Sequence, residues 1–306
     1  MSAGPHSPYP APPGDHTPGG PRDEADAARV AALASAAAAQ VEPAPTAPPD
    51  LSAAAFFDVD NTIMRGASLY HLARGLYRRR FFGLRDIAGF ARQQLSFVLV
   101  GENLDSMKGI QAKALGMVAG HCVAELRAVG EEVFDEVMAG KIWPQTHDLA
   151  RRHVESGQRV WLVTATPIEV ADVIAARLGL TGALGTVSEH VDGVYTGRLV
   201  GMPMHGQVKA EAVLALAERE GLDLARCAAY SDSANDIPML SLVGAPHAVN
   251  PDAALRAHAR AHGWPVRDFR RGRRAVRVGL PVAAVAGALV GAGMGAAAVG
   301  RRRQPG

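Results

Sequence analysis

Two acidic side chains end an apolar run in the stretch AAFFDVDNT, residues 54–62. Side chains alternate along a β-strand, so Asp58 and Asp60 are expected to project to the same side of it. Burying carboxylates without partners is costly, and a strand that ends in two of them indicates a site that uses their charge. Because Mg²⁺ prefers oxygen ligands, such a pair is suited to hold this ion, and Thr62 adds a hydroxyl beside it.

Two further polar residues follow later apolar runs. Thr164 ends the run in LVTATP and could donate a hydrogen bond to a phosphate oxygen, although threonine also commonly closes a β-strand. Thr166 and Pro167 read as an ordinary helix start, with threonine as the N-cap. Lys209 opens a helical pattern, where the helix dipole prefers anions, so its charge indicates a nearby anion. A solvated lysine is the alternative.

The stretch YSDSANDIPML adds two more carboxylates. Asp232 stands at the end of an apolar run, Asp236 lies one helical turn further, and Asn235 lies between them. The small residues around them leave space for a close-packed polar site. The alternative is that Asp232 or Asn235 only caps the helix that follows.

Asp58, Thr164 and Asp232 stand at or near the ends of apolar runs of strand type. Such runs recur at 53–58, 159–165, 227–232 and 245–250. Helical patterns separate the runs, at 167–180, 209–222 and 251–263. This alternation predicts an α/β, Rossmann-like fold with a mostly parallel sheet covered on both faces. Open sheets of this class bind ligands at the carboxyl ends of their strands, so the polar residues are expected to meet there.

Two segments depart from the alternation. A crossover between parallel strands needs only a dozen or so residues, but residues 66–145 form a much longer stretch with helical periodicity. This stretch predicts a helical cap inserted after the first strand, lying over the carboxyl edge of the sheet. The segment 185–199 predicts a β-hairpin that turns at Asp192 and Gly193.

Taken in this order, the motifs resemble those of the haloacid dehalogenase superfamily of phosphohydrolases. The resemblance is closest to its phosphoserine-phosphatase-like branch, subfamily IB. It covers 51–267 and rests on DxDxT at 58–62, Thr164, Lys209 and SDSAND at 231–236. The helical insertion is similar to the cap of that family.

The resemblance implies a Mg²⁺-dependent phosphatase that acts on a small phosphorylated substrate. Asp58 would attack phosphorus and form an aspartyl-phosphate. Asp60 would protonate the departing alcohol and later take a proton from water. Thr164 and Lys209 would bind the phosphoryl oxygens. The metal would be held by the carboxylates of Asp58 and Asp232 and by the backbone carbonyl of Asp60.

In the same resemblance, Asn235 and Asp236 would orient Lys209 and the waters of the metal. One departure concerns the substrate. Phosphoserine-specific members carry an acidic residue shortly after DxDxT, whereas residues 63–71 contain no Asp or Glu, which argues against phosphoserine.

Two other functions are compatible with the same residues. A phosphotransferase would differ only in the acceptor that replaces water. A membrane-tethered binding protein without turnover is the second, although such a protein would be expected to have lost one of the essential groups. A dehalogenase is disfavoured, because attack on carbon needs neither a second acid such as Asp60 nor a metal ligand such as Asp232.

Overall composition limits the partners. The net charge of the 306 residues is only +2, so no nucleic-acid partner is expected. Cys122 and Cys227 are too few for a disulfide framework or a zinc site, and reduced thiols are expected. Residues 1–50, rich in alanine and proline, predict a disordered leader that buries little surface, with one weak helix near 24–40.

The C-terminal residues 268–306 form a separate basic-flanked tail. Residues 278–299 carry no charge and lie between the basic clusters 267–277 and 301–303. This segment predicts a membrane anchor that leaves the catalytic domain in the cytoplasm at the inner face of the cell membrane. A lipid-linked phosphate would then be a plausible substrate. A flexible tail rich in alanine and glycine is the alternative.

Overall fold

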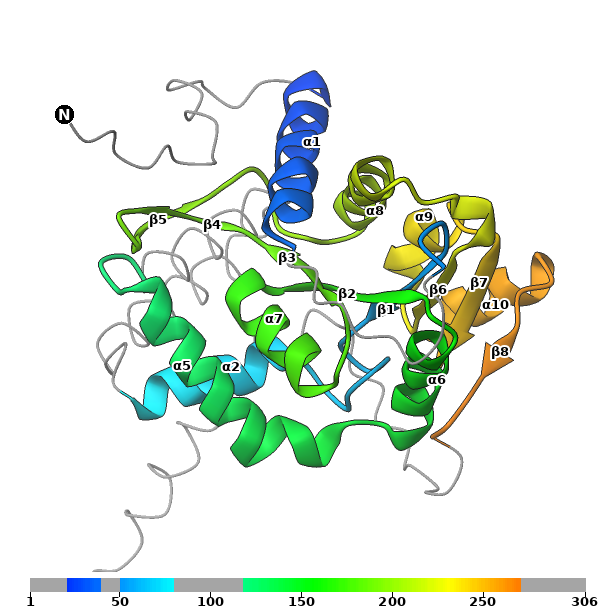
Figure 1. The fold of residues 1–306 in the computed structure, drawn as a ribbon, viewed down its shortest axis with the longest axis horizontal. Helices are drawn as coiled ribbons and strands as arrows, with labels where there is room; N and C mark the ends of the chain where they lie inside the picture. Colours follow the sequence, from blue (N-terminus) through cyan, green and yellow to red (C-terminus); the bar gives the residue numbers. More distant parts are fainter. Residues whose placement is uncertain (1–20, 40–49, 80–117, 271–306) are drawn as a thin grey trace, which may run out of the picture.

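A parallel sheet forms the centre of the molecule (Figure 1). The computed structural model describes residues 21–39, 50–79 and 118–270. Six strands pair in the order β3-β2-β1-β6-β7-β8, and all five pairings are parallel. The strands are β1 (Ala54–Asp58), β2 (Arg159–Pro167), β3 (Gly182–Thr186), β6 (Ala228–Ser231), β7 (Ala245–Val249) and β8 (Val266–Arg267). The predicted α/β fold with a mostly parallel sheet is confirmed.

Helices cover both faces of this sheet. Those in the described residues are α1 (Pro21–Ala38), α2 (Ser68–Arg78), α5 (Val123–Val133), α6 (Pro144–Glu155), α7 (Ile168–Arg177), α8 (Gln207–Glu220), α9 (Ile237–Leu240) and α10 (Ala253–Ala261). Alternate residues of β1 face opposite sides. Ala55 and Phe57 pack in the core with α2, α5, α6 and α7, whereas Ala54 and Phe56 pack in the core with α1, α8, α9 and α10.

The described part of the predicted cap contains α2 and α5, followed by a π-helical turn at Phe134–Met138. Residues 80–117 of the predicted cap lie outside the described residues. Helix α5 packs closely on α7, since a Cβ at Gly130 would lie 3.1 Å from a methyl group of Val170. The insertion therefore rests on a helix that directly follows β2.

The predicted hairpin is present as β4 (Ser188–Val191) and β5 (Val194–Leu199), an antiparallel pair outside the main sheet. Asp192 and Gly193 have φ values of 51° and 76°, as a tight hairpin turn requires. The hairpin also bonds to the start of α5. The amide of Tyr195 donates to the His121 carbonyl at 3.0 Å, and the Tyr195 carbonyl accepts from the Gly120 amide at 2.9 Å.

The helix expected near 24–40 is present as α1, but the expectation that this segment buries little surface is wrong. Alanines on the inner side of α1 are buried, namely Ala28, Ala31, Ala32, Ala34 and Ala36. A Cβ at Gly201 would lie 2.5 Å from the amide nitrogen of Ala31, so the two backbones nearly touch. Small side chains allow α1 to approach α8 and the loop that precedes it this closely (Figure 1).

The predicted membrane anchor at 278–299 lies outside the described residues and stays a prediction. Within the described ranges, none of the helices combines the length and apolar character that crossing a bilayer requires.

Gly185 of β3 has no room for a side chain. A Cβ there would lie 2.7 Å from the Cα of Ile168 and 2.8 Å from the carbonyl oxygen of Thr166. We expect Gly185→Ala to lower the free energy of unfolding by about 1–3 kcal/mol, because backbone atoms at the start of α7 must shift. Urea denaturation measures this change. Gly140→Ala, which places a Cβ in open space, is the matched control, and equal stability of the two variants would contradict the prediction.

Candidate active site

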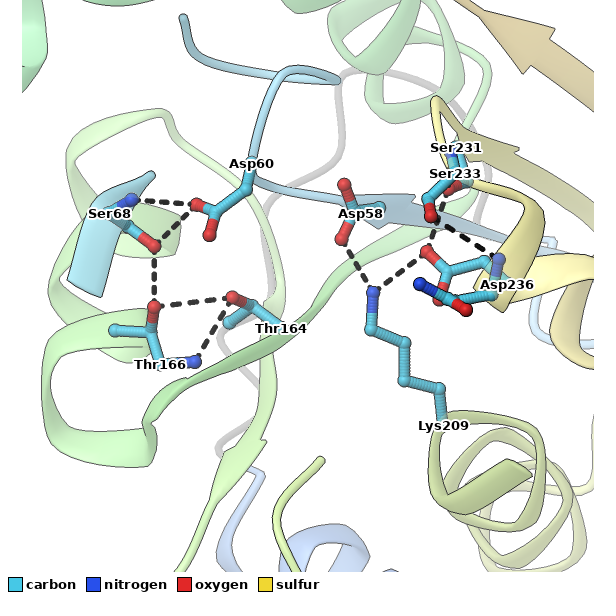
Figure 2. Close-up of polar contacts among 10 residues, drawn as sticks. Asp58, Asp60, Ser68, Thr164, Thr166, Lys209, Ser231, Ser233 and Asp236 are labelled. Atoms are coloured by element: carbon cyan, nitrogen blue, oxygen red, sulfur yellow. Dashed lines mark hydrogen bonds and ion pairs between the residues drawn. The ribbon is translucent and has the colours of Figure 1, made fainter. Parts of the chain in front are cut away.

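Three parallel strands lie side by side at one edge of the sheet, where β1 and β6 end level with the middle of β2. Asp58 is the last residue of β1 and pairs in register with Val163 of β2, one residue before Thr164. Strand β6 lies on the other side of β1 and ends at Ser231, directly before Asp232. The carboxyl ends of these strands thus bring together residues that lie far apart in the sequence (Figure 2).

Lys209 lies at the centre of the buried polar network. Its ammonium donates to Oδ1 of Asp58 at 2.6 Å and to Oδ2 of Asp236 at 2.8 Å (Figure 2). Ser231 Oγ donates to the same Asp236 oxygen at 2.7 Å. The side chain of Lys209 is only 5% exposed. Helix α8 places it there because the chain enters the helix through Gly206, at a φ of 55° that favours glycine.

Negative charge exceeds positive charge at this edge. Burial raises the pKa of Asp58 to about 7, against the opposing effect of Lys209, and repulsion from Asp236 and Asp60 adds to the rise. Burial and repulsion from Asp58 likewise raise the pKa of Asp232 to about 8. Burial alone would lower the pKa of Lys209, but the charges of Asp58 and Asp236 outweigh it and raise that pKa. Lys209 is therefore held in its charged form.

Asp60 lies just beyond β1, where Asn61 takes a φ of 61° and turns the chain. Oδ1 of Asp60 accepts two hydrogen bonds from Ser68, one from the amide at 2.8 Å and one from Oγ at 2.5 Å. Burial raises the pKa of Asp60, whereas the bonds from Ser68 act in the opposite direction. Ser68 could not be recognised from the sequence, because a single serine at a helix start has many uses.

Thr164 is buried at the predicted strand end, where its Oγ1 lies 3.3 Å from Oγ1 of Thr166. The expectation that Thr166 caps the next helix is wrong. Strand β2 continues to Pro167, and Thr166 Oγ1 instead lies 2.5 Å from Ser68 Oγ. A second residue missed by sequence reasoning is Asp252, whose amide donates to the carbonyl of Asp232 at 2.7 Å.

Asn235 and Asp236, which are predicted to orient Lys209 and the waters of the metal, have different surroundings. Asp236 contacts Lys209 directly, as described above. Asn235 is exposed, and its amide donates to Ser233 Oγ at 3.3 Å within the short helical turn Ala234–Asp236. The structure therefore brings Asp236, but not the Asn235 side chain, into the hydrogen-bonded network of Lys209.

The donor set at the strand ends fits Mg²⁺. In the described residues, no three His, Cys, Asp or Glu side chains are grouped so that they could hold a metal. The predicted ligand set needs only two side chains, those of Asp58 and Asp232, because its third protein ligand is the backbone carbonyl of Asp60. Burial first, and then repulsion from neighbouring carboxylates, raises the pKa values of both side chains. A divalent cation bound between them would offset both effects.

The strand-end residues lie within a region that matches a known family. A family model described as haloacid dehalogenase-like hydrolase matches residues 55–241, which include every site residue named so far except Asp252. The chain belongs to this family. The predicted resemblance is thus confirmed, and this haloacid dehalogenase-like hydrolase is an enzyme.

Named relatives of this haloacid dehalogenase-like hydrolase include phosphatases. It is 56% identical over 258 residues to phosphoserine phosphatase SerB1 of Mycobacterium tuberculosis, covering 84% of this chain and 83% of that protein. It is 31% identical over 222 residues to a histidinol-phosphatase of Neisseria meningitidis, covering 71% of this chain and 98% of that protein. These similarities support the predicted phosphatase class.

A solved structure shares the fold of this haloacid dehalogenase-like hydrolase. It is a protein of unknown function from Bordetella pertussis Tohama I, 34% identical, with a TM-score of 0.62. The match covers 71% of this chain and 98% of that one. The fold is therefore also found in a protein with about seven tenths of the length of this chain.

Proposed function

We propose that this enzyme is a Mg²⁺-dependent phosphatase that hydrolyses a small phosphate monoester through an aspartyl-phosphate on Asp58. The observation that carries the proposal is the buried contact of Asp58 with Lys209 at the end of β1, beside Thr164 and Asp232. A carboxylate, a fixed cation and a hydroxyl at one strand edge are the groups that transfer of a phosphoryl group requires. The phosphatases among the relatives support the same conclusion.

In the first step, a carboxylate oxygen of Asp58 forms a bond to phosphorus. The bond between phosphorus and the ester oxygen breaks, and its electron pair stays on that oxygen, which takes a proton from Asp60. The alcohol leaves, Asp60 is then a carboxylate, and Asp58 carries the phosphoryl group.

In the second step, Asp60 takes a proton from a water molecule as the water oxygen bonds to phosphorus. The bond between phosphorus and Asp58 breaks, and the carboxylate of Asp58 is restored together with inorganic phosphate. Asp60 is protonated again and ready for the next ester.

The remaining residues stabilise charge. Lys209 and Thr164 donate to the phosphoryl oxygens, and Asp236 keeps the Lys209 ammonium in place. Asp58, Asp232 and the backbone carbonyl of Asp60 would hold Mg²⁺. When bound, the metal supplies positive charge that reduces the repulsion between the nucleophile and the anionic phosphate.

The alcohol part of the ester is not fixed by these groups. One relative is named for phosphoserine and another for histidinol, whereas the stretch 63–71 lacks the acidic residue that argues for phosphoserine. We propose a cytoplasmic catalytic domain, which the predicted segment 278–299 would hold at the membrane. Esters of a lipid therefore belong among the candidates to be tested.

We expect the full chain to release phosphate from at least one ester in a panel of phosphoserine, histidinol phosphate, sugar phosphates and lysophosphatidic acid, and only with Mg²⁺. Treatment with EDTA should reduce release to background, and added Mg²⁺ should restore it. Asp232→Asn should raise the Mg²⁺ concentration needed for half-maximal rate by about 10-fold or more, because a metal carboxylate is lost. A rate unaffected by EDTA would contradict the metal requirement, and no release from any ester would contradict the phosphatase.

A further inference from the structure

The two oxygens of the Asp60 carboxylate have different surroundings. Oδ1 accepts both the amide and the hydroxyl of Ser68, at 2.8 and 2.5 Å (Figure 2). No described residue donates a hydrogen bond to Oδ2. Ser68 is the first residue of α2 and is fully buried, so its two donors are fixed by the start of this helix and by its packing.

Ser68 is itself held by a second hydroxyl. Its Oγ lies 2.5 Å from Oγ1 of Thr166, which lies 3.3 Å from Oγ1 of Thr164. A carboxylate oxygen can only accept, so the Ser68 hydroxyl donates to Asp60 and its oxygen accepts from Thr166. In the free enzyme, the Thr166 oxygen also accepts from Thr164. Two buried hydroxyls, those of Thr166 and Ser68, thus donate in one direction toward Asp60, and the Thr164 hydroxyl can turn to a phosphoryl oxygen when an ester is bound (Figure 2).

From this geometry we infer that Ser68, supported by Thr166, is the positioning residue of the general acid. The inference rests on the proposed phosphatase function. With Oδ1 occupied by two donors, the proton that is passed to the ester oxygen resides on Oδ2. Ser68 also prevents rotation of the carboxylate, which would exchange the two oxygens and turn the proton away from the ester.

A purely structural role would also satisfy these contacts, since Asp60 could serve only as an acceptor for the first amide of α2. The two roles differ in their dependence on the leaving group. An alkyl alcohol must be protonated as it departs, whereas p-nitrophenolate is stable as an anion and departs without a proton. If Ser68 positions the acid, its loss lowers the rate more for an alkyl ester than for p-nitrophenyl phosphate. If Ser68 is only structural, its loss lowers both rates equally.

We expect Ser68→Ala to lower kcat/KM about 10- to 100-fold for the best alkyl phosphate, and less than about 3-fold for p-nitrophenyl phosphate. The ratio kcat/KM covers only the steps through departure of the alcohol, so later hydrolysis of the aspartyl-phosphate does not enter. Both esters are assayed on the same preparation. Partial unfolding of the variant would reduce both rates equally and leave their ratio unchanged.

Variants of Thr166 test the inference through the same ratio of kcat/KM for the two esters. Thr166→Val should change the ratio in the same direction by a smaller factor, because Ser68 loses its hydrogen-bond donor. Thr166→Ser keeps a hydroxyl and should restore the wild-type ratio. Thr146→Val is the matched control, since it removes a buried hydroxyl that has no partner among the described residues, and it should leave the ratio unchanged.

The outcomes separate this inference from the function on which it rests. If Ser68→Ala lowers kcat/KM equally for both esters, Ser68 is only structural, and the inference is overturned while the phosphatase stands. If the wild-type chain hydrolyses neither ester, the proposed function and the inference both fall. A selective loss with the alkyl ester, restored in Thr166→Ser but absent in Thr146→Val, supports the inference.

Discussion

Asp58→Asn is expected to lower Mg²⁺-dependent phosphate release by about 10⁴-fold or more, because the amide cannot form the bond to phosphorus. The change is small in volume, and the remaining oxygen can still accept from Lys209, as Oδ1 of Asp58 does at 2.6 Å. The loss should therefore appear in kcat and not as a loss of folded protein. Continuous measurement of phosphate release from the best ester of the panel tests the expectation.

The thermal stability of Asp58→Asn, unlike its rate, is not expected to fall. Asp58 is buried among other acidic groups, and its removal relieves repulsion that helps to raise the pKa of Asp232. Thermal unfolding without metal should therefore show Asp58→Asn to be at least as stable as the wild type. The matched control is Asp223→Asn, whose carboxylate accepts from the amide of Ala225 at 3.0 Å away from the site. This control should retain its rate.

A covalent intermediate gives a second readout. Acid quenching during turnover of an ester labelled in the phosphate should leave label on the wild-type chain and none on Asp58→Asn. If Asp58→Asn kept more than about one hundredth of the wild-type rate, Asp58 could not be the nucleophile, and water would have to attack the ester directly.

The strand ends could be predicted from the sequence because the apolar runs end in polar residues and also alternate with helical patterns. Apolar runs that end in Asp58, Thr164 and Asp232 place these residues at one edge once the sheet is parallel. Lys209 could be located because a cation in the first turn of a helix conflicts with the dipole. Local sequence and global topology agree at Asp58 and Asp232, so prediction and structure agree there, whereas β2 continues beyond Thr164 to Pro167.

Strand β3 could not be predicted, because its identity depends on its neighbours. Its sequence GALGT contains no run of β-branched or aromatic residues, although all five residues are buried. The role of Gly185 is visible only in the structure, where the backbone of Ile168 passes close by. The burial of the α1 alanines could not be predicted for the same reason. Alanine has little apolar area by itself, and it is buried here because a partner helix, α8, packs against it.

Ser68 and Thr166 show why the rest of the site was missed. They are 98 positions apart, and each is a common hydroxyl residue with an ordinary local explanation. Their function depends on a distance between side chains, which periodicity and motif spacing do not contain. Contacts of this kind can be found only after the strands and helices have been placed in space.

Lys209→Met is expected to reduce both activity and stability, and it is the second change with a large effect. The variant removes the cation that contacts both Asp58 and Asp236, and neither carboxylate keeps another partner of opposite charge within the described residues. Breaking a buried ion pair from one side costs about 3–5 kcal/mol. Loss of one charge-stabilising donor should also lower kcat by about 10²- to 10³-fold. Urea denaturation without metal and phosphate release measure the two losses.

A double variant separates these losses. Asp236→Asn combined with Lys209→Met removes one of the two unpaired charges, and the new amide oxygen can still accept from Ser231, as Asp236 does at 2.7 Å. We expect the double variant to regain part of the lost stability but none of the lost rate. Recovery of both would mean that Lys209 acts only on folding and does not contact the phosphoryl group. Recovery of stability alone would show that one ammonium serves two needs, because it balances the carboxylates in the free enzyme and the phosphoryl oxygens during transfer.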